Sequence, residues 1–312
     1  MTNYSPIRIS TLKSKLDIPF PLFIHFRDHY LEYAKAGSQF TDDKFIKLKR
    51  QKIARFYILD VDEKKYQNFL DELLNKTLND PNTKIEAKVD LVQGAAETAL
   101  DNMQANPQSQ ASYKMTQNAA KKVRELVQKN PDALKFMFGN NQESEPIIKH
   151  SINVCTLCIK LASHYKLPDS DIDHLATAAL MHDIGVGNLD ENTQLLFKKP
   201  KQELDAQERQ AYFHHCFNIF RILKEKPYAT PEVMELVENH EENKSGSGPN
   251  KKTKLSRSEE ILSLVNTYDK RVTIEGMKPQ EAMKKMMIEE LGNYELKSLQ
   301  TLQEILKKEK LF

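Results

Sequence analysis

The chain has 312 residues, of which 39% are hydrophobic and 29% are charged, and its formal net charge is +2. This length suffices for two domains with a substantial core, and so small a net charge gives no global field that would attract nucleic acid or a membrane surface. No segment approaches the roughly 20 apolar residues that cross a bilayer, and residues 1–20 lack the apolar stretch of a signal peptide. We therefore expect a cytoplasmic protein with no membrane span and no DNA partner.

Residues 1–80 are expected to form a small α+β domain. Residues 40–53 begin with a Thr-Asp cap and then follow a helical period, and residues 62–78 form an amphipathic helix with a charged outer face. Strands are predicted where β-forming residues alternate or run apolar, namely at residues 6–12, 20–26, 30–36 and 54–61. Nothing in this part has catalytic spacing, and its role is not indicated.

Residues 81–140 follow a turn cluster at 79–84 and are polar and helix-forming, with few large apolar side chains before residue 130. Two interpretations are open: a helical connector between domains, or a helical layer packed on the next domain. Polar helices of this kind would suit dimerisation. Residues 1–140 are therefore the expected location of a homodimer contact or of a protein partner.

From residue 141 to residue 312 helix follows helix, and no strand pattern is evident. Asp205, Thr230 and Ser256 stand at expected N-cap positions. The candidate helices are 146–166, 169–184, 204–225, 230–242, 255–272, 278–292 and 295–310. The expected fold is mainly α: an all-α C-terminal domain with its site in the core between facing helices, preceded by the small α+β domain and the helical connector.

The three cysteines are Cys155, Cys158 and Cys216. Cys155 and Cys158 form a C-x-x-C pattern, which zinc and redox sites share, but no second cysteine pair completes a zinc knuckle. The pair lies on or beside the apolar face of an amphipathic helix. We expect these cysteines to act as small buried hydrophobic side chains.

Histidines are concentrated between residues 150 and 240, where seven of the nine lie. Five polar residues stand out because they lie at helix ends or face inward from different predicted helices: His150, His182, Asp183, His215 and His240. Histidine and carboxylate suit borderline-soft divalent metals, and a carboxylate directly after a histidine can bridge two ions. Two metals about 4 Å apart clamp both the attacking and the leaving oxygen of a phosphoryl transfer. The pattern therefore predicts a metal-dependent phosphohydrolase.

The His182-Asp183 pair closes an apolar helix. Buried there, the two polar side chains need a partner, because an unpaired buried charge is costly, and a metal would supply one. The alternative is a helix C-cap with an exposed His-Asp pair. Gly185 and Gly187 follow, and glycine would allow the chain to turn tightly around the site.

Further polar residues lie downstream. Asn266 and Asp269 are three residues apart on one predicted helix and share a face. Asp269 is a candidate metal ligand or an acceptor that orients one, and Asn266 can ligate only through its carbonyl oxygen. Glu241 and Glu242 are either partners that orient an imidazole or solvated charges at a helix end.

Residues 140–312 resemble the HD superfamily and, within it, the HD-GYP branch, which consists of bacterial cyclic di-GMP phosphodiesterases with helical domains and bi- or trinuclear metal sites, often iron. His150 matches the first family histidine, and His182 and Asp183 match the His-Asp doublet. The stretch 204–223 matches the family segment whose single histidine falls on His215, which favours His215 over the adjacent His214. Similar, though altered, family segments are found at residues 239–249, 262–272 and 289–296.

Several positions depart from the HD-GYP pattern. Asn239 stands in place of a histidine, Val186 in place of a lysine and Asn266 in place of the usual ligand aspartate, while Asp269 aligns with the second aspartate. The missing histidine implies a binuclear rather than a trinuclear centre.

The signature tyrosine is also absent, because Gly248 directly precedes Pro249, as in the unconventional members of the branch. The arginine-rich stretch is reduced to Arg271. These changes affect the residues that the family uses to hold its substrate.

The resemblance implies a cyclic di-GMP phosphodiesterase in which a hydroxide bridging two divalent metal ions, iron or alternatively manganese, attacks the phosphodiester. Asp183 and His182 are the expected catalytic residues. The expected metal-binding set is His150, His182, Asp183, His215, His240, Asn266 and Asp269. Basic side chains near the site in sequence would hold phosphates or, alternatively, form a solvated loop: Lys251, Lys252, Lys254 and Arg271.

Two other functions remain open. The altered signature suits a receptor that binds cyclic di-GMP without hydrolysing it and signals through the N-terminal part. An HD phosphohydrolase acting on a related nucleotide is the other alternative. Metal content and turnover separate the enzyme from the receptor, and a panel of nucleotides separates the two enzymes.

Overall fold

The computed structural model describes residues 3–140 and 144–312. Its contacts divide the chain into two compact units, Met1–Met115 and Thr116–Phe312. The boundary falls inside helix α4, Gln110–Lys129. The division into domains 1–80, 81–140 and 141–312 stays a prediction, and residues 141–143 at its second boundary lie outside the described residues.

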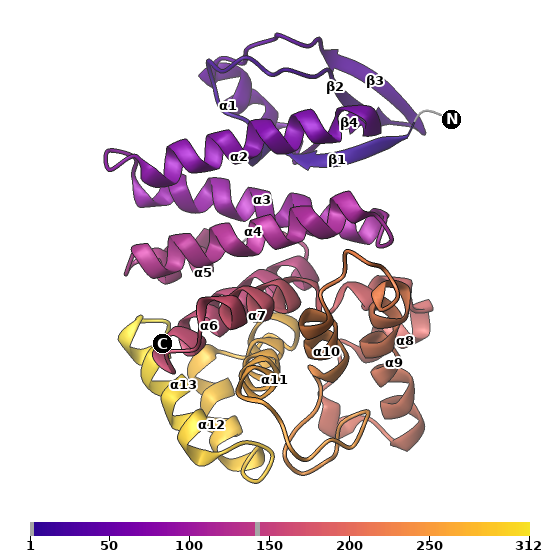
Figure 1. Cartoon of the computed structure of the whole chain (residues 1–312), viewed down its shortest axis with the longest axis vertical. Coiled ribbons are helices and arrows are strands. Elements are labelled where there is room, and N and C mark those ends of the chain that lie inside the picture. The colour runs from indigo at the N-terminus through magenta and orange to yellow at the C-terminus, as the bar shows by residue number, and fades with distance from the viewer. Residues whose placement is uncertain (1–2, 141–143) are drawn as a thin grey trace. The chain divides into compact units, whose positions relative to one another are not determined.

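The N-terminal unit contains a four-stranded antiparallel sheet (Figure 1). Ser5 pairs with Ile58 and Ile7 with Phe56, and the side chains of Ile7, Phe56 and Ile58 are buried. The spatial order of the strands is β1 (Tyr4–Arg8), β4 (Arg55–Leu59), β2 (Leu22–Phe26) and β3 (His29–Ala34). Alternation along β4 sends Phe56 and Ile58 to one face, as the period of two predicts. The expected small α+β arrangement is confirmed.

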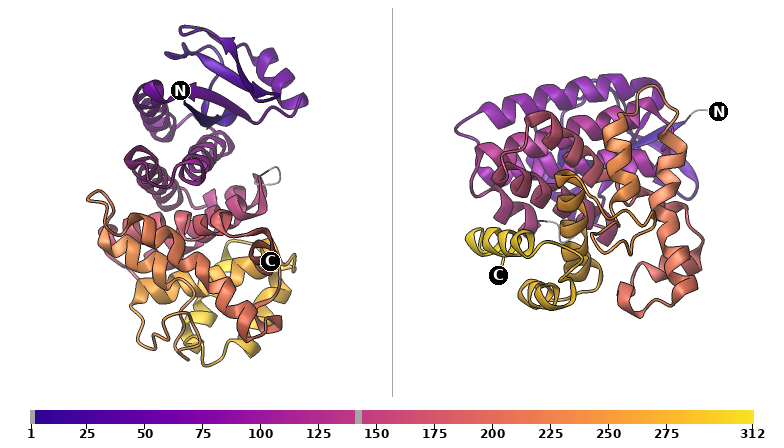
Figure 2. Two further views of the ribbon diagram at one scale, coloured as in Figure 1. Left: turned by 90° about the vertical axis from the view of Figure 1, so that its right-hand side faces the viewer. Right: turned by 60° about the horizontal axis from the view of Figure 1, so that its bottom comes forward.

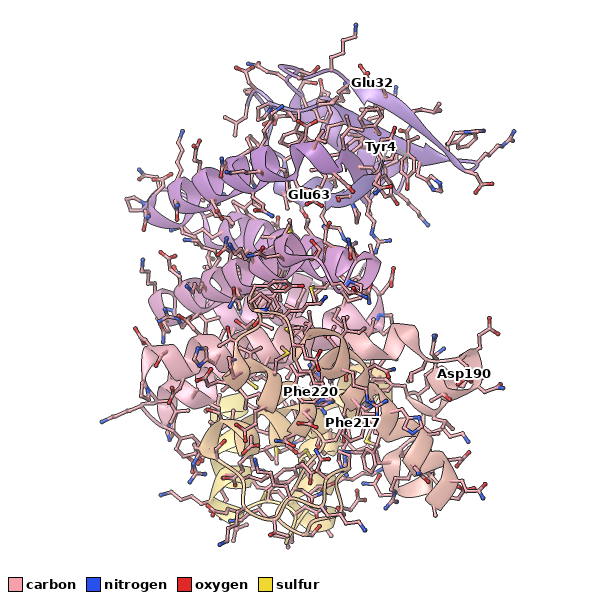
Figure 3. The ribbon with its side chains drawn as sticks, turned by 45° about the vertical axis from the view of Figure 1, so that its right-hand side comes forward. Tyr4, Glu32, Glu63, Asp190, Phe217 and Phe220 are labelled. Atoms are coloured by element: carbon pink, nitrogen blue, oxygen red, sulfur yellow. The ribbon has the colours of Figure 1, made fainter. Side chains whose placement is uncertain are left out.

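The described residues of this unit also form the helices α1 (Asp42–Arg50), α2 (Glu63–Asn79) and α3 (Ile85–Ala105), followed by the start of α4. α2 packs on α3. α3 in turn packs on β1 and on the 3-10 turn Ile9–Thr11, which follows β1. The absence of a side chain at Gly94 of α3 allows a close approach, because a Cβ atom there would collide with the side chain of Ser10. Tyr4, labelled in Figure 3, stacks on Tyr30 with ring centroids 3.9 Å apart.

Strands and helix are also tied together by one buried carboxylate in this unit. Asp101 on α3 accepts two hydrogen bonds from the guanidinium of Arg8, at 2.6 and 2.9 Å, and two from that of Arg55, at 3.0 and 2.8 Å. Arg8 and Arg55 face each other on paired strands, so a single carboxylate binds both guanidinium groups.

The C-terminal unit is helical, and its described residues form no strand beyond one isolated bridge. After α4 and α5 (Ala133–Asn140), its helices are α6 (Pro146–His164), α7 (Asp169–Met181), α8 (Glu191–Leu196), α9 (Ala206–Leu223), α10 (Pro231–Asn239), α11 (Arg257–Asp269), α12 (Pro279–Glu289) and α13 (Leu296–Lys308). The predicted all-α fold is confirmed. None of the described helices is long and apolar enough to cross a bilayer.

The helix α6 is central to this unit. Almost every residue from Ile148 to Ala162 is buried, as expected for a helix that is covered on all sides. α7 and α11 both pack on α6, while α10 packs on α7 and α9 (Figures 1 and 2). The helices that carry the histidines are therefore neighbours in space.

Helix caps behave largely as predicted. Asp205 and Ser256 each form a capping box, with Glu208 and Glu259 respectively. Thr230 stands at the N-cap of α10, but its hydroxyl makes no cap bond and instead accepts a hydrogen bond from Gln117. The short α8 was not predicted; it is capped by Asp190, which Figure 3 labels.

Candidate metal centre

Four imidazoles and one carboxylate meet in the core of the C-terminal unit. α6 supplies His150, the end of α7 supplies His182 and Asp183, α9 supplies His215, and the residue that ends α10 is His240. Each of these side chains is fully buried. The neighbouring His214 is exposed on α9. The structure therefore brings together the five residues on which the sequence prediction depended.

Gly185 determines how closely the His182-Asp183 segment approaches α9. A Cβ atom at this position would collide with the backbone carbonyl oxygen of His215. The chain turns here as the 3-10 turn Ile184–Asn188, and neither Gly185 nor Gly187 has a positive φ, so this turn does not use the left-handed conformation that glycine allows. The requirement at Gly185 is close packing, which holds Asp183 and His215 at a fixed separation.

The carboxylate of Asp183 faces two pairs of histidines, one with each oxygen. Its Oδ2 atom lies 3.3 Å from Nε2 of His150 and 3.2 Å from Nε2 of His182. Its Oδ1 atom lies 3.5 Å from Nε2 of His215 and 3.4 Å from Nε2 of His240. Asp183 is thus shared between two niches, each lined by two imidazole nitrogens.

All four imidazoles point a lone pair into these niches. His150 donates from Nδ1 to the carboxylate of Asp269 at 2.8 Å. The other three donate from Nδ1 to the backbone carbonyl three residues earlier, at 2.8, 2.5 and 2.6 Å: His182, His215 and His240. Because carbonyl and carboxylate oxygens only accept, the neutral ring keeps its proton on Nδ1 and leaves Nε2 as an acceptor.

In each niche, hydrogen-bond acceptors consequently face one another: two Nε2 atoms and one oxygen of Asp183. The Nε2 atoms of His150 and His182 are 3.2 Å apart, and those of His215 and His240 are 3.0 Å apart. Neither oxygen of Asp183 accepts a hydrogen bond from any residue that the structure describes. Converging acceptors without donors are unfavourable in a buried site unless a cation lies between them.

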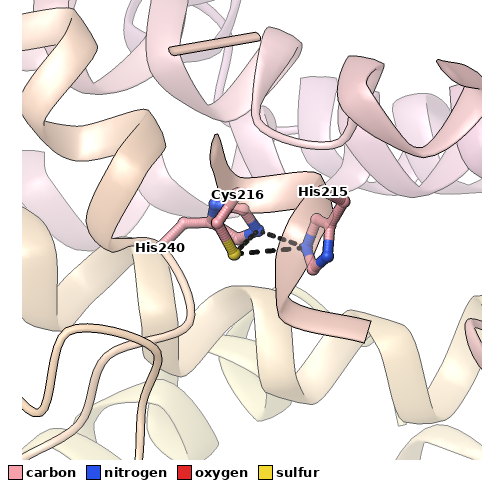
Figure 4. Close-up of side chains that lie close together, drawn as sticks. All are labelled: His215, Cys216 and His240. Carbon is pink, nitrogen blue, oxygen red and sulfur yellow. Dashed lines mark hydrogen bonds between the residues drawn. The ribbon is translucent and has the colours of Figure 1, made fainter. Parts of the chain in front are cut away.

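The negative charge on Asp183 increases the need for a cation between these acceptors. Burial alone would raise the pKa of its carboxyl group, but protonated imidazoles of His182, His150 and His240 outweigh burial and hold the pKa well below its usual range. The carboxylates of Asp183 and Asp269 in turn overcome burial and raise the pKa of His150 to about 9, and a bound metal ion would displace the proton that faces the niche. A deprotonated carboxylate and neutral imidazoles are the forms in which these side chains ligate metals. The donor set fits divalent cations of borderline softness. The ligand atoms form two groups, one of His150, His182 and Asp183 and the other of His215, Cys216 and His240. Figure 4 shows the second group.

Asn266 and Asp269 take different places around His150. Asp269 accepts from Nδ1 of His150 and, through its other oxygen, from the amide of Asn153 at 3.0 Å. The Oδ1 atom of Asn266 lies 2.9 Å from Nε2 of His150, on the side of the ring that faces the niche. Asp269 therefore orients the imidazole, while Asn266 presents a carbonyl oxygen beside the ligand nitrogen.

A buried polar network keeps the Asn266 amide in this orientation. Glu241 accepts a hydrogen bond from Nδ2 of Asn266 at 3.2 Å and another from the hydroxyl of Tyr212 at 2.6 Å. Lys201 donates to the other oxygen of Glu241, and Lys270 donates to the Tyr212 hydroxyl at 2.9 Å. Because Nδ2 is used in this way, Oδ1 of Asn266 is the atom turned toward His150.

Both lysines of the network respond to burial and to Glu241. Burial lowers the pKa of Lys270 to about 8, although the carboxylate of Glu241 acts in the opposite direction. Burial also disfavours the charged form of Lys201, but Glu241 outweighs it, so that the pKa of Lys201 is raised. The pKa of Glu241 is lowered because Lys201 and His240 overcome the effect of burial.

Sequence reasoning missed three members of this region: Cys216, Lys201 and Lys270. Cys216 and Lys270 directly follow His215 and Asp269, so adjacency was the only available signal for them. Lys201 lies in the 3-10 turn Lys201–Glu203, forty positions before its partner Glu241, and no sequence pattern links the two.

The four basic residues expected to hold phosphates divide into two groups. Arg271 donates to Glu289 at 2.7 Å and to Glu290 at 2.6 Å, and Lys252 pairs with Glu235 and Glu259. Exposed side chains are found at the other two positions, Lys251 and Lys254.

The loop after His240 is hydrogen-bonded to the side chain of Glu242. This carboxylate accepts hydrogen bonds from the backbone N–H groups of Asn250 and Lys252. Asn239 is also engaged away from the histidines, because it donates to Glu259 at 2.9 Å and accepts from Asn250 at 3.1 Å. Asn239, which stands where the HD-GYP pattern has a histidine, thus helps to hold the loop instead of facing the candidate metal centre.

The profile of the HD domain family matches residues 110–295, more than half of the chain. Among solved structures, the chain is similar to "Bd1817, a HDG"Y"P protein from Bdellovibrio bacteriovorus", with 26% sequence identity and a TM-score of 0.76 over 98% of this chain and 100% of that chain. No curated protein sequence matches significantly. With the ligand geometry, these matches support a metal-dependent HD phosphohydrolase. The chain belongs to the HD domain family and, within it, to the HD-GYP branch.

Proposed function

We propose that the protein is a binuclear metal-dependent phosphodiesterase that hydrolyses cyclic di-GMP. The observation that carries this proposal is the two-sided environment of Asp183, whose Oδ2 faces His150 and His182 and whose Oδ1 faces His215 and His240. A carboxylate in this position would hold two cations, and paired cations are the usual catalysts of phosphodiester hydrolysis. Membership of the HD-GYP branch supports cyclic di-GMP as the substrate.

The two ions would share Asp183 and otherwise use separate ligands. His150 and His182 would hold one ion, with the carbonyl oxygen of Asn266 as an additional ligand. His215 and His240 would hold the other. Iron is the expected metal and manganese the alternative, since imidazole and carboxylate donors suit both.

When bound, two divalent ions supply Lewis acidity, which lowers the pKa of coordinated water and offsets charge on the non-bridging phosphate oxygens. The side chains around the site contribute by orienting the ligand atoms. Asp269 keeps the lone pair of His150 directed inward, and Glu241 keeps the oxygen of Asn266 directed toward that ring. Burial excludes bulk water from the acceptors and so strengthens their interaction with cationic groups.

One observation favours a second candidate function, hydrolysis of another nucleotide. Arg271 and Lys252 are bound to carboxylates, which leaves Lys251 and Lys254 as the exposed members of the expected phosphate-binding set. A site that holds phosphates with fewer basic groups suits a smaller or less charged substrate. Comparing turnover of cyclic di-GMP, cyclic mononucleotides and linear dinucleotides would separate the two functions.

The proposal is tested by elemental analysis and a cyclic di-GMP hydrolysis assay on the same anaerobically prepared sample. We expect about two metal ions per chain, with turnover to a linear dinucleotide or to GMP. His215→Ala should lose at least one ion and all turnover, whereas His214→Ala, at the exposed neighbouring position, should keep both. Two ions without turnover of any nucleotide would indicate a receptor, and the absence of metal after iron or manganese loading would contradict the proposal.

A further inference from the structure

Cys216 lies inside the candidate metal centre, next to the imidazoles of His215 and His240 (Figure 4). Its Sγ atom is 3.6 Å from Nε2 of His215 and 3.9 Å from Nε2 of His240, and the residue is fully buried. The two Nε2 atoms are 3.0 Å apart. One sulfur and two nitrogens therefore form a small triangle.

The edges of this triangle match those of a coordination sphere. Metal–sulfur bonds of about 2.3 Å and metal–nitrogen bonds of about 2.0–2.1 Å, at the tetrahedral angle, separate sulfur from nitrogen by about 3.6 Å and nitrogen from nitrogen by about 3.4 Å. The observed sulfur–nitrogen separations equal or slightly exceed that value, and the nitrogen–nitrogen separation is slightly shorter.

A thiol hydrogen bond does not account for the cluster. The single S–H proton of Cys216 can serve one acceptor, but Nε2 of His215, Nε2 of His240 and Oδ1 of Asp183 all face this niche. Asp183 Oδ1 is moreover buried and receives no hydrogen bond from the described residues. Three acceptors need more positive charge than one thiol proton supplies, and a divalent cation supplies it.

The two other cysteines provide a contrast. Cys155 and Cys158 lie on α6, are fully buried, and belong to neither group of candidate ligands among the described residues. The sulfur of Cys158 has a backbone carbonyl, that of Ile261, as its polar neighbour at 4.0 Å. The expected role of a small hydrophobic side chain suits these two residues but does not suit Cys216.

We propose that Cys216 is a thiolate ligand of the metal ion held by His215 and His240; this inference rests on the proposed binuclear centre. Metal binding forms a metal–sulfur bond and releases the thiol proton to solvent. The two positions of the centre then differ in chemistry, because His150, His182 and Asn266 offer only nitrogen and oxygen donors. The thiolate favours iron, cobalt or zinc over manganese and magnesium at its own position.

Cobalt(II) tests the proposal, because a cobalt–thiolate bond gives a sulfur-to-metal charge-transfer band in the near ultraviolet that nitrogen and oxygen ligands do not give. The metal-free full chain is titrated with cobalt(II) as wild type, as Cys216→Ser and as the control Cys155→Ser/Cys158→Ser. We expect the band in the wild type and in the control and its complete loss in Cys216→Ser. Circular dichroism of each variant checks that the helices are intact.

X-ray absorption at the cobalt edge gives a second readout that needs no variant, since the wild type should show one sulfur at about 2.3 Å from half of the cobalt. A band that persists in Cys216→Ser, or bound cobalt without a sulfur neighbour in the wild type, overturns the thiolate assignment alone. Failure of the wild type to bind any cobalt, iron or manganese overturns the proposed function together with the thiolate assignment.

Discussion

Each unit of the chain contains a buried aspartate, and the two carboxylates differ in how their negative charge is compensated. The side chain of Asp101 is 3% exposed and accepts four hydrogen bonds from the guanidinium groups of Arg8 and Arg55. The side chain of Asp183 is 0% exposed and receives none from the described residues, although four imidazoles surround it. The chain itself compensates Asp101, whereas we propose that bound cations compensate Asp183.

The largest expected effect is that of Asp183→Asn. The amide keeps the shape of the side chain but removes the charge and one of the two oxygens that face the histidine pairs. We expect loss of both metal ions and a fall in hydrolysis of about a thousandfold or more, since the loss of one charge-stabilising donor alone costs up to about that factor. Metal analysis and the hydrolysis assay measure both, and retention of two ions would show that Asp183 is not the bridge.

Asp101→Ala should instead affect stability. Removing the carboxylate leaves the buried guanidinium of Arg8 without its main partner, and breaking such a pair costs about 3–5 kcal/mol. We expect a decrease at the lower end of this range in the free energy of unfolding, because Arg55 is partly exposed and can be solvated. Urea denaturation measures the change. Metal content should stay at the wild-type value, and a loss of metal here would weaken the contrast between the two aspartates.

Chelation of the metal should destabilise the wild type by a comparable amount. A ligand present at 100 times its dissociation constant stabilises the folded state by about 2.7 kcal/mol, so its removal lowers the thermal midpoint. Thermal unfolding with and without chelator measures the shift. Asp183→Asn should not respond to the chelator, whereas Asp101→Ala should respond as the wild type does.

Glu241→Gln should weaken the binding of one ion without abolishing it. The glutamine amide can donate as well as accept, so the orientation of the Asn266 amide is no longer fixed. Losing a partner that orients a ligand typically costs about 10–100-fold in metal affinity. Competition with a chelator of known affinity measures this change. Glu238→Gln, on α10, serves as the matched control and should bind both ions as tightly as the wild type does.

The smallest effect is expected for the exposed loop lysines. If Lys251 and Lys254 contact substrate phosphates, their double replacement by alanine should raise KM about fivefold, because an exposed ion pair contributes about 1 kcal/mol or less. The value of kcat should stay the same, and the increase in KM should shrink at high salt. Lys308→Ala, at an exposed position of α13, is the control, and an unchanged KM in the double variant would remove these lysines from the substrate site.

Much of the fold could be predicted because local patterns agreed with tertiary packing. The period of two along residues 54–61 became β4, and the caps Asp205 and Ser256 begin α9 and α11. The helix α8, Glu191–Leu196, was missed because six residues are too few to show a helical period. Gly185 was noticed, but its role depends on the approach of α9, which the sequence does not contain.

Some residues of the site could likewise be identified from the sequence, whereas the roles of others depend on tertiary packing. The histidines and Asp183 were identifiable because their spacing at helix ends is unusual for structural residues. Asn266 and Asp269 share a helix face, and only the packing of α11 on α6 determines which of them contacts each nitrogen of His150. The sequence assigned no role to Cys216, because its contact with His240 joins two helices separated in sequence.

The most direct test of the central claim is anomalous X-ray diffraction from crystals of the iron- or manganese-loaded protein. A binuclear centre gives two anomalous peaks about 4 Å apart, one beside each oxygen of Asp183, with His150 and His182 on one side and His215 and His240 on the other. A single peak, or no peak within bonding distance of Asp183, would contradict it.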